Sequence, residues 1–346
     1  MRHVSPPSFF RNWLMLSRPL FMAGIITAIF IFGHSAQAMT VSPVLYDYEV
    51  EPGGSRQGSI ALSNDGNRPE LFALEANNFV PFGEDGAQQY VEEETPTGLA
   101  SWMTFDRPSI LLQPGETAAF PFVVTVPKDA EPGGHYASIF FSRVPDATEG
   151  SGVGVGGAIG VLVLVNVTGD VHEEARIESF VVRGPRIHHR LPVYFDTRIR
   201  NLGSVHFRPR GELVIRNVFG RVVSRSSVNP KNSAVLPNSI RRVETAWARA
   251  TEEGPGGFFA EIKNEWKHFA IGPYTASVSM VYGSKAWQLE GAEVSFWVIP
   301  WRLILVAFVG VLSLVLLGVG YHRMVAAAVL AKERKRNAAP KRGKKK

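Results

Sequence analysis

An uncharged, mostly apolar stretch near the C-terminal end constrains the possible folds of this chain more than any other feature. The eighteen residues from Leu303 to Gly320 carry no charge, and a run of this length can cross a bilayer as a helix. Beyond Gly320 the chain has ten Lys and Arg residues against one acidic residue, Glu333. Because basic flanks are retained in the cytoplasm, we predict a single transmembrane helix over 299–322 and a basic cytoplasmic tail over 323–346.

The residues around this stretch indicate where the membrane begins and ends. Two tryptophans, Trp297 and Trp301, flank its start, and indole rings favour the headgroup zone of a bilayer. We therefore place the outer boundary between Trp297 and Leu303 and the inner boundary between Gly320 and Arg323. A short β-like run, 294–298, precedes Pro300, so we expect the last strand to enter the membrane segment almost without a linker.

The N-terminal end predicts export independently. Three arginines precede an apolar run of fourteen residues, 20–33, which leads to Ala36-Gln37-Ala38. This pattern is typical of a secretory signal peptide over 1–38, with cleavage between Ala38 and Met39. The alternative is an uncleaved signal anchor. Both interpretations place residues 39–298 outside the cytoplasm and predict a cell-membrane protein with an external ectodomain.

Composition limits what the exported part can be. The chain has no cysteine, which excludes a disulfide framework and thiolate chemistry, and its roughly 260 exported residues suit two domains with ordinary cores. Residues 39–170 hold five Lys and Arg against eighteen Asp and Glu, whereas 171–298 hold eighteen against twelve. The high pI therefore does not indicate a nucleic-acid partner. We hypothesise that the basic domain lies against the anionic envelope and that the acidic domain projects from it.

Both exported segments have the sequence pattern of β-structure. Apolar residues alternate at Phe120, Phe122, Val124 and Val126, and again over 193–199 and 276–282, which is typical of half-buried antiparallel strands. Many short runs of this kind separated by turn residues indicate sandwiches. We predict an all-β fold of two tandem immunoglobulin-like β-sandwich domains, 39–170 and 171–298, followed by the C-terminal helix. The best helical pattern outside the membrane segment, 261–268, predicts at most two turns in a connection.

Proline and glycine mark the joints between the predicted strands. Proline presets the backbone for a tight turn and glycine accepts a positive φ. A first strand over 41–50 and a second around 59–63 flank one such joint, and Trp102 is expected to begin a strand and to plug the core or an edge. The predicted turn and core residues are Pro52, Gly53, Trp102, Pro114, Gly115, Gly133, Gly134 and Tyr136.

These joints, taken in order, resemble a known family. The segments Val41-x-Pro43, Pro52-Gly53, Trp102, Leu112-x-Pro114-Gly115-Glu116, Val126-Pro127 and Pro132-Gly133-Gly134-His135-Tyr136 look like the first domain of the WxL-interacting proteins of Gram-positive cell surfaces. More distantly, they are similar to the N-terminal immunoglobulin-like domain of pilus chaperones. The second domain resembles its WxL-interacting counterpart in size, in position and in the segment 235–241. The resemblance implies a first domain that binds peptidoglycan and a second that binds a partner or host ligand, but it transfers no ligand-binding residue to this chain.

Motifs for catalysis or cofactor binding are weak. The segment 152–157 satisfies G-x-G-x-x-G, yet it leads into a β-like run instead of opening a helix, so we interpret it as a hairpin. His188 and His189 are adjacent, which points them to opposite faces of a strand, and Glu92-Glu93-Glu94 is typical of a solvated loop. We expect no catalytic residues, no metal ligands and no cofactor.

Three functional classes follow from these patterns. The favoured class is a non-catalytic, membrane-anchored surface protein that binds peptidoglycan, another wall polymer or a surface protein. The second is a chaperone-like assembly factor that pairs an edge strand with an exported client. The third is an envelope enzyme, which would need carboxylates or histidines converging from separate strands.

Overall fold

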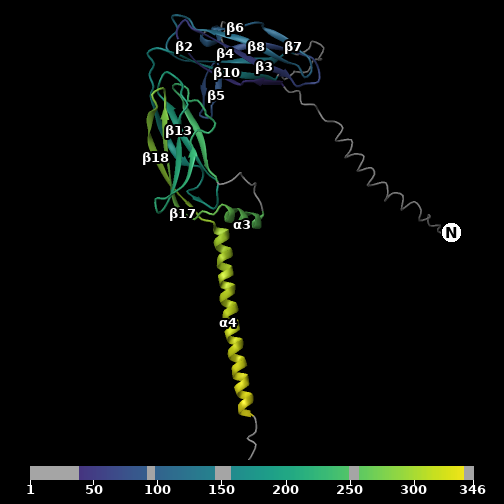
Figure 1. The fold of residues 1–346 in the computed structure, drawn as a ribbon, viewed down its shortest axis with the longest axis vertical. Helices are drawn as coiled ribbons and strands as arrows, with labels where there is room; N and C mark the ends of the chain where they lie inside the picture. Colours follow the sequence, from purple (N-terminus) through teal and green to yellow (C-terminus); the bar gives the residue numbers. More distant parts are fainter. Residues whose placement is uncertain (1–38, 92–97, 145–156, 249–256, 339–346) are drawn as a thin grey trace, which may run out of the picture. The chain divides into compact units, whose positions relative to one another are not determined.

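The computed structural model describes residues 39–91, 98–144, 157–248 and 257–338. They form two compact units (Figure 1). The first contains the described residues up to Phe79 together with Tyr90–Glu131 and His135–Thr168, and the second contains Val80–Gln89, Pro132–Gly134 and the described residues from Gly169 onward. Both are β-structures, and one long apolar helix ends the second. The predicted all-β fold class with a C-terminal helix is confirmed.

Two sheets build the first unit, with the strand orders β1-β3-β8-β6 and β2-β10-β9-β4-β5, and β7 pairs with β4. The end of β4, most of β5 and the first two residues of β9 extend from these sheets into the second unit. A four-residue helix, α2, precedes β6. The elements are β1 (Met39–Ser42), β2 (Leu45–Val50), β3 (Ser55–Asn64), β4 (Glu70–Phe82), β5 (Ala87–Tyr90), α2 (Gly98–Ser101), β6 (Met103–Phe105), β7 (Ser109–Leu112), β8 (Thr117–Thr125), β9 (Gly133–Arg143) and β10 (Ala158–Val167).

The core of the first unit lies between these two sheets. Phe120, Phe122 and Val124 of β8 are all buried, as their alternation with polar neighbours predicts. The ring of Phe120 meets that of Phe141, on β9 of the other sheet, edge to face with 5.3 Å between centroids. Aromatic pairs of this geometry add specific packing to the burial of apolar area, so the two sheets close as a sandwich.

The predicted first strand over 41–50 is wrong in one respect, because the structure divides it. β1 ends at Ser42 and pairs with β3, whereas β2 begins at Leu45 and runs parallel to β10 in the other sheet. Pro43 lies between them, and a proline nitrogen cannot donate to a strand ladder. The chain therefore changes sheets at this proline.

The second unit has sheets with the orders β11-β13-β16 and β12-β18-β17-β14-β15. Helix α3 precedes β17, and α4 follows β18. The elements are β11 (Ala175–Val182), β12 (Ile187–His188), β13 (Val193–Asn201), β14 (Arg210–Asn217), β15 (Val222–Ser227), β16 (Ile240–Trp247), α3 (Phe258–Lys267), β17 (Gly272–Tyr282), β18 (Trp287–Val298) and α4 (Trp301–Ala338).

A second core fills this sandwich. On β13 every other residue is buried, including Val193, Phe195 and Ile199, which confirms the predicted half-buried strand. Phe195 meets Phe296 of β18 edge to face at 5.4 Å. Trp247 of β16 is fully buried and lies 4.8 Å from the ring of Tyr274. Packing between the two sheets is thus centred on aromatic rings.

A buried asparagine with the same set of hydrogen bonds to the backbone occurs at a strand end in each sandwich. Asn64, at the end of β3, donates through Nδ2 to the carbonyls of Arg68 and Leu112 and accepts from the amide of Gly66. Asn201, at the end of β13, makes the same three bonds with Val205, Val235 and Gly203.

The backbone around the two asparagines matches as well. The amide of Asn64 donates to the carbonyl of Glu116, four residues beyond Leu112, and the amide of Asn201 donates to that of Ser239, four residues beyond Val235. Leu112 and Val235 are the residues whose carbonyls the two side chains bind. Gly115 and Asn238, with φ of 73° and 54°, occupy the corresponding left-handed positions. Each asparagine provides hydrogen bonds to buried backbone groups that would otherwise have no partner, and it joins a strand end to the neighbouring loop.

The helices differ from the sequence-based expectations. α3 has ten residues, which is longer than the two turns predicted over 261–268. α4 begins at Trp301 and continues to Ala338, well past the predicted membrane segment, because the residues from Met324 onward are mostly good helix formers.

Candidate functional site: the junction of β18 and α4

The last strand of the second sandwich passes into the apolar helix over two residues, Ile299 and Pro300. The amide of Ile299 donates to the carbonyl of His188 at 2.8 Å, and the amide of Trp301 donates to Ile299 at 2.8 Å. Proline is well suited to this position, since its missing N–H and fixed φ are tolerated where a helix starts. The short linker predicted from the sequence is present, and the hydrogen bond from Ile299 to His188 fixes it to β12.

Two buried carboxylates of α3 hold the first turn of α4. Glu265 accepts from the guanidinium of Arg302 at 3.1 Å and from the backbone amide of Leu303 at 3.0 Å. Glu261 accepts from Arg190 at 2.8 Å and lies 3.6 Å from Arg302. The first amides of a helix have no partner within it and carry a partial positive charge. Glu265 therefore caps α4 from a neighbouring element.

The adjacent histidines lie in different surroundings. The ring of His188 packs edge-on against Phe296 with 6.1 Å between centroids, and its Nε2 has no hydrogen-bond partner among the described residues. Burial, with a smaller contribution from His189, holds the pKa of His188 below its usual value. His189 instead places Nδ1 at 3.4 Å from the carbonyl oxygen of Ile299. The two side chains form no shared ligand site.

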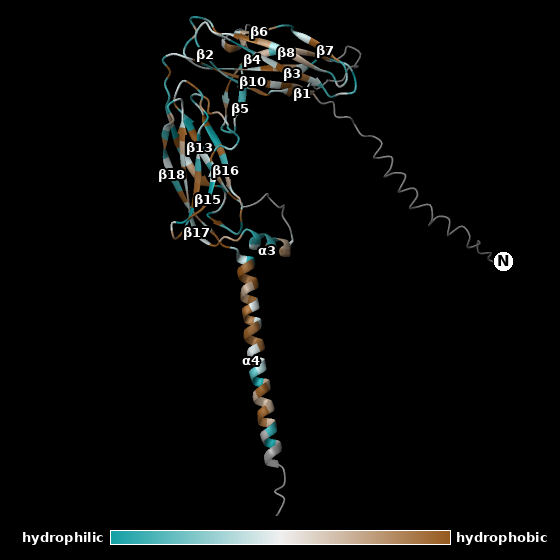
Figure 2. Ribbon diagram, viewed as in Figure 1, coloured by the Kyte–Doolittle hydropathy of each residue, from teal (hydrophilic) through white to brown (hydrophobic). Residues whose placement is uncertain are grey.

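Helix α4 is the one element, among the described residues, that is long and apolar enough to cross a membrane. The segment that is long and apolar enough runs from Trp301 to Lys332, and Figure 2 colours most of α4 as hydrophobic. Its 38 residues correspond to about 57 Å of helix, against a bilayer core of roughly 30 Å. Of the predicted boundary residues, Trp297 lies on β18, and Trp301, Leu303, Gly320 and Arg323 all lie on α4.

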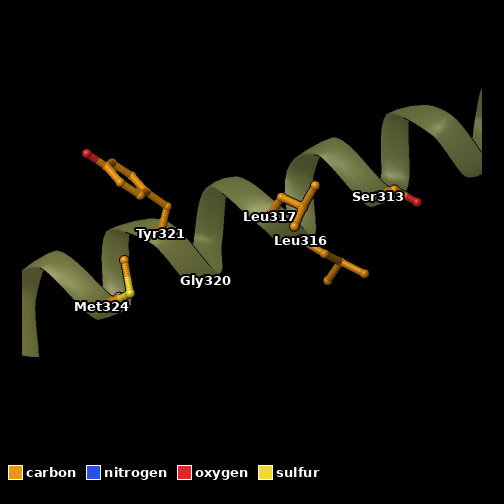
Figure 3. A pocket seen from close by; sticks show the side chains of 6 residues that line it. All are labelled: Ser313, Leu316, Leu317, Gly320, Tyr321 and Met324. Carbon is orange, nitrogen blue, oxygen red and sulfur yellow. The ribbon is translucent and has the colours of Figure 1, made fainter.

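A shallow depression on α4 is lined by six of its own residues. Figure 3 shows them along one stretch of the helix, where Tyr321 and Leu316 project in different directions. The lining residues are Ser313, Leu316, Leu317, Gly320, Tyr321 and Met324. A single helix cannot enclose a ligand, so this depression belongs to the outer surface of α4.

The predicted turn residues are divided between the two units, with Gly133 and Gly134 in the second and the others in the first. Gly53 and Gly115 have φ of 81° and 73°, where glycine avoids the strain that a Cβ would impose. Pro52 and Pro114 precede them in the same turns. Gly133, with φ of 140°, and Gly134 begin β9.

The predicted aromatic residues of the first unit are half-buried. Trp102 follows α2, and its ring lies 4.6 Å from that of His135. The strand that it was expected to begin starts one residue later, at Met103. Tyr136, on β9, packs its ring 5.9 Å from that of Phe79. No ligand-binding role for either residue follows from these contacts.

Some predicted positions fall outside the described residues. Ala36 and Ala38 of the predicted cleavage site are among them, whereas Met39 is the first residue of β1. The triplet Glu92-Glu93-Glu94 and most of the glycine-rich segment 152–157 also lie outside. Within the described ranges, His, Asp and Glu side chains form no group of three or more that could hold a metal ion.

Among the described residues, the start of β10 extends past its neighbour β2 at one edge of the first sandwich. β2 pairs with residues 162–167 of β10, because the chain upstream of Leu45 has crossed to the other sheet. The first residues of β10, from Ala158 to Val161, extend beyond this pairing. On the side that faces β2, the backbone N–H and C=O groups of these residues are of the kind that pair with an added strand.

Comparison with known proteins finds no family model and no curated protein that matches the chain. Among solved structures, the chain is similar to the class 5 fimbriae chaperone CfaA at 8% identity, over 76% of this chain and 100% of that one, with a TM-score of 0.36. It is similar to the E. coli chaperone DraB at 12% identity, over 75% and 98%, with a TM-score of 0.33.

A third similar structure is the CsuC–CsuE chaperone–tip adhesion subunit pre-assembly complex of the archaic chaperone-usher Csu pili of Acinetobacter baumannii. Its match has 12% identity over 74% of this chain and 97% of that chain, with a TM-score of 0.34. Similarity at this level supports no statement about what this chain binds.

Proposed function

We propose that this protein is a non-catalytic, membrane-anchored surface protein whose β-sandwich ectodomain binds a cell-wall polymer or another surface protein. The observation that carries the proposal is the junction described above. A folded sandwich continues over two residues into a helix of membrane-spanning length, and buried ion pairs of Glu261 and Glu265 fix that connection. In this arrangement the sandwiches lie outside and the basic tail lies in the cytoplasm.

The proposed ligand class is suggested by the sequence. The ordered proline and glycine joints of residues 39–170 resemble the WxL-interacting proteins, in which the corresponding domain binds peptidoglycan. The acidic character of the first domain makes a neutral or cationic partner more favourable than a polyanionic one. A peptidoglycan strand or a protein surface therefore suits this domain better than nucleic acid or a phosphate-rich polymer.

An alternative function is an assembly factor that pairs an edge strand with an exported client. The segment of β10 from Ala158 to Val161, which extends past its pairing with β2, favours this alternative. An added strand would gain main-chain hydrogen bonds at this edge. Both functions use a non-catalytic ectodomain held at the membrane, but they differ in the surface that makes contact.

Capture by the ectodomain tests the proposal. Residues 39–298, immobilised on a resin, are expected to retain purified peptidoglycan fragments or a defined set of surface proteins from solubilised envelopes. The acidic and basic halves, 39–170 and 171–298, would then be used separately to locate the binding. Retention of neither class above a blank resin would contradict the proposed function.

A photo-crosslinking amino acid at Ala158, in the full-length protein, separates the two functions. Ala158 is exposed at the open end of β10, so a client strand would be captured there. The matched control places the same group at Ser279, an exposed position on β17, which is an interior strand that lies between β14 and β18 in its sheet. Crosslinks at Ala158 but not at Ser279 would favour the assembly factor, and their absence with retained ectodomain capture would favour the surface-binding protein.

A further inference from the structure

Helix α3 is built in the reverse of the usual pattern for a surface helix. Its charged residues Glu261 and Glu265 are 8% and 2% exposed, whereas Phe259 and Trp266 are 83% and 75% exposed. A helix on the surface of a soluble domain normally buries its apolar side. This helix presents its apolar side outward.

The ion pairs of α3 fix this reversed orientation. Arg190, in the loop between β12 and β13, binds Glu261, and Arg302, in the first turn of α4, contacts both glutamates. Buried carboxylates without these cations would be strongly unfavourable. The polar face of α3 is thus held against the sandwich and the start of α4, and the opposite face has to point away.

The outward face has a defined composition. At about 100° per residue, Phe258, Ile262, Trp266 and Phe259 fall within an arc of roughly 100°. Phe258 is 46% exposed and Ile262 is half-buried. Lys263 and Lys267 follow beside Phe259 on the same side of the helix and are exposed. Aromatic residues bordered by lysines are typical of helices that lie in a membrane interface.

Other exposed apolar residues occur at the same end of the second sandwich. Asn217, the last residue of β14, pairs with Tyr274, and Gly272 pairs with Val298, from which the chain leaves for α4. The β14–β15 turn therefore lies at the end of the sandwich from which α4 departs. Val218 and Phe219 in this turn are 65% and 84% exposed.

We call this surface the apolar end. Its residues come from the β14–β15 turn, from α3 and the link that follows it, and from the approach to α4. They are Val218, Phe219, Phe258, Phe259, Trp266, Phe269, Ile271, Trp297 and Trp301, and all are at least 42% exposed. So many large apolar side chains exposed at one end mark an interaction site.

We propose that the apolar end inserts into the headgroup region of the bilayer that α4 crosses. The occupant follows from continuity, because Trp301 belongs both to the apolar end and to the first turn of α4, so a bilayer around α4 also reaches the neighbouring aromatic rings. Indole and phenyl rings with flanking lysines match the chemistry of the interface between acyl chains and anionic headgroups. This inference rests on the proposed membrane anchoring.

Site-specific labelling tests the contact, because the chain has no native cysteine. Single cysteines replace Phe259, Phe219, Trp287 or Leu314 in the full-length protein, which is labelled with an environment-sensitive fluorophore and reconstituted into phosphatidylcholine–phosphatidylglycerol vesicles. Quenching by lipids with a doxyl group near the headgroup or deep in the acyl chain reports depth. Phe219, Phe259 and Leu314 are 84%, 83% and 70% exposed, so substitution removes little packing.

Trp287 provides the matched aromatic control. It is 48% exposed and pairs with Tyr282 in the β17–β18 hairpin, at the far end of the same strands from Val298. We expect blue-shifted emission and shallow quenching at Phe259→Cys and Phe219→Cys, deep quenching at Leu314→Cys, and no quenching at Trp287→Cys.

The label at Leu314→Cys on α4 distinguishes two outcomes, namely that the apolar end does not insert and that α4 does not cross the membrane. Deep quenching at Leu314→Cys with no quenching at both Phe259→Cys and Phe219→Cys would overturn the insertion of the apolar end and leave the anchor intact. A blue shift at these two sites without quenching by either lipid would identify a protein contact and would also overturn it. No quenching at Leu314→Cys would overturn the anchoring itself.

Discussion

At the residue scale, the strand-end asparagines show how the two sandwiches are held together locally. Asn64 and Asn201 are 0% and 1% exposed, and each makes three hydrogen bonds to backbone groups. A buried backbone group without a partner costs about 1–3 kcal/mol. Each of these side chains therefore contributes more to stability than an ordinary polar residue does.

Replacement of these asparagines is expected to destabilise the unit that contains them. Asn64→Ala should destabilise the first unit, and Asn201→Ala the second, by about 1–3 kcal/mol each or more, because carbonyl and amide groups lose their partners. Thermal unfolding of the full-length protein in detergent, followed by circular dichroism, measures the effect. Asn67→Ala, at an exposed position in the loop that follows Asn64, is the control and should stay within about 0.5 kcal/mol. Unchanged unfolding of Asn201→Ala would contradict this role.

The sequence pattern indicated a turn beside Asn64 but not the roles of Asn64 and Asn201 themselves. The segment around Pro114 was predicted as a turn in which Gly115 accepts a positive φ, whereas the segment 235–241 was noted only as part of a resemblance. The hydrogen bonds of Asn201 reach Val235, 34 residues away, and such distant pairing has no local signature. The recurrence of Asn-x-Gly before an x-Pro-Gly or x-Pro-Asn turn in both halves was the available signal.

At the scale of elements, alternation predicted the strands better than it predicted the helices. β13 and β8 bury every other residue, so a period of two identified them. α3 buries glutamates and exposes aromatic rings, and its amphipathic pattern gave no indication of which face is buried. Its partners Arg190 and Arg302 lie 71 and 37 residues away from Glu261 and Glu265, so a local pattern could not show that these glutamates are buried.

Loss of charge at Glu265 is expected to loosen the connection of α3 to α4. In Glu265→Gln the amide no longer neutralises Arg302 and accepts more weakly from the amide of Leu303. Because Arg302 is 24% exposed, the cost should be about 1–3 kcal/mol, less than for a fully buried ion pair. Hydrogen–deuterium exchange should accelerate in α3 and in the first turn of α4.

The matched control for this change is Glu290→Gln, at an exposed position on β18. Exchange in α3 and α4 should be unchanged in that variant. Equal exchange in Glu265→Gln and Glu290→Gln would show that the cap does not stabilise the junction.

At the scale of the whole molecule, the order of segments was the most predictable feature. The apolar run from Leu303 to Gly320 identified the position of α4, and alternating apolar runs separated by turn residues indicated two β-sandwiches before it. The sequence did not reveal that α4 continues to Ala338, since hydropathy registers the apolar run and not the helix-forming residues that follow Arg323. The change of sheet at Pro43 was also missed, because both flanking segments have strand-like composition.

Removal of α4 is expected to release the ectodomain from the membrane. A chain that stops after Val298 should move to the soluble fraction, whereas the full-length protein should remain in the pellet after alkaline carbonate extraction. A chain that stops after Ala338 keeps all of α4 and serves as the control, so it should behave as the full-length protein does. Carbonate extraction of the full-length protein into the supernatant would contradict membrane anchoring.

The two-residue joint after Val298 also has a mechanical consequence. If a ligand pulls on an anchored ectodomain, the force enters the second sandwich through the C-terminal end of β18 and acts along that strand. β18 pairs with β17 over most of its length and with β12 on its other side, so many hydrogen bonds resist sliding together instead of opening one after another. Because only two residues separate Val298 from Trp301, tension on α4 reaches the sheet directly. The hydrogen bonds between β18 and its neighbouring strands therefore set the force that the second sandwich can withstand.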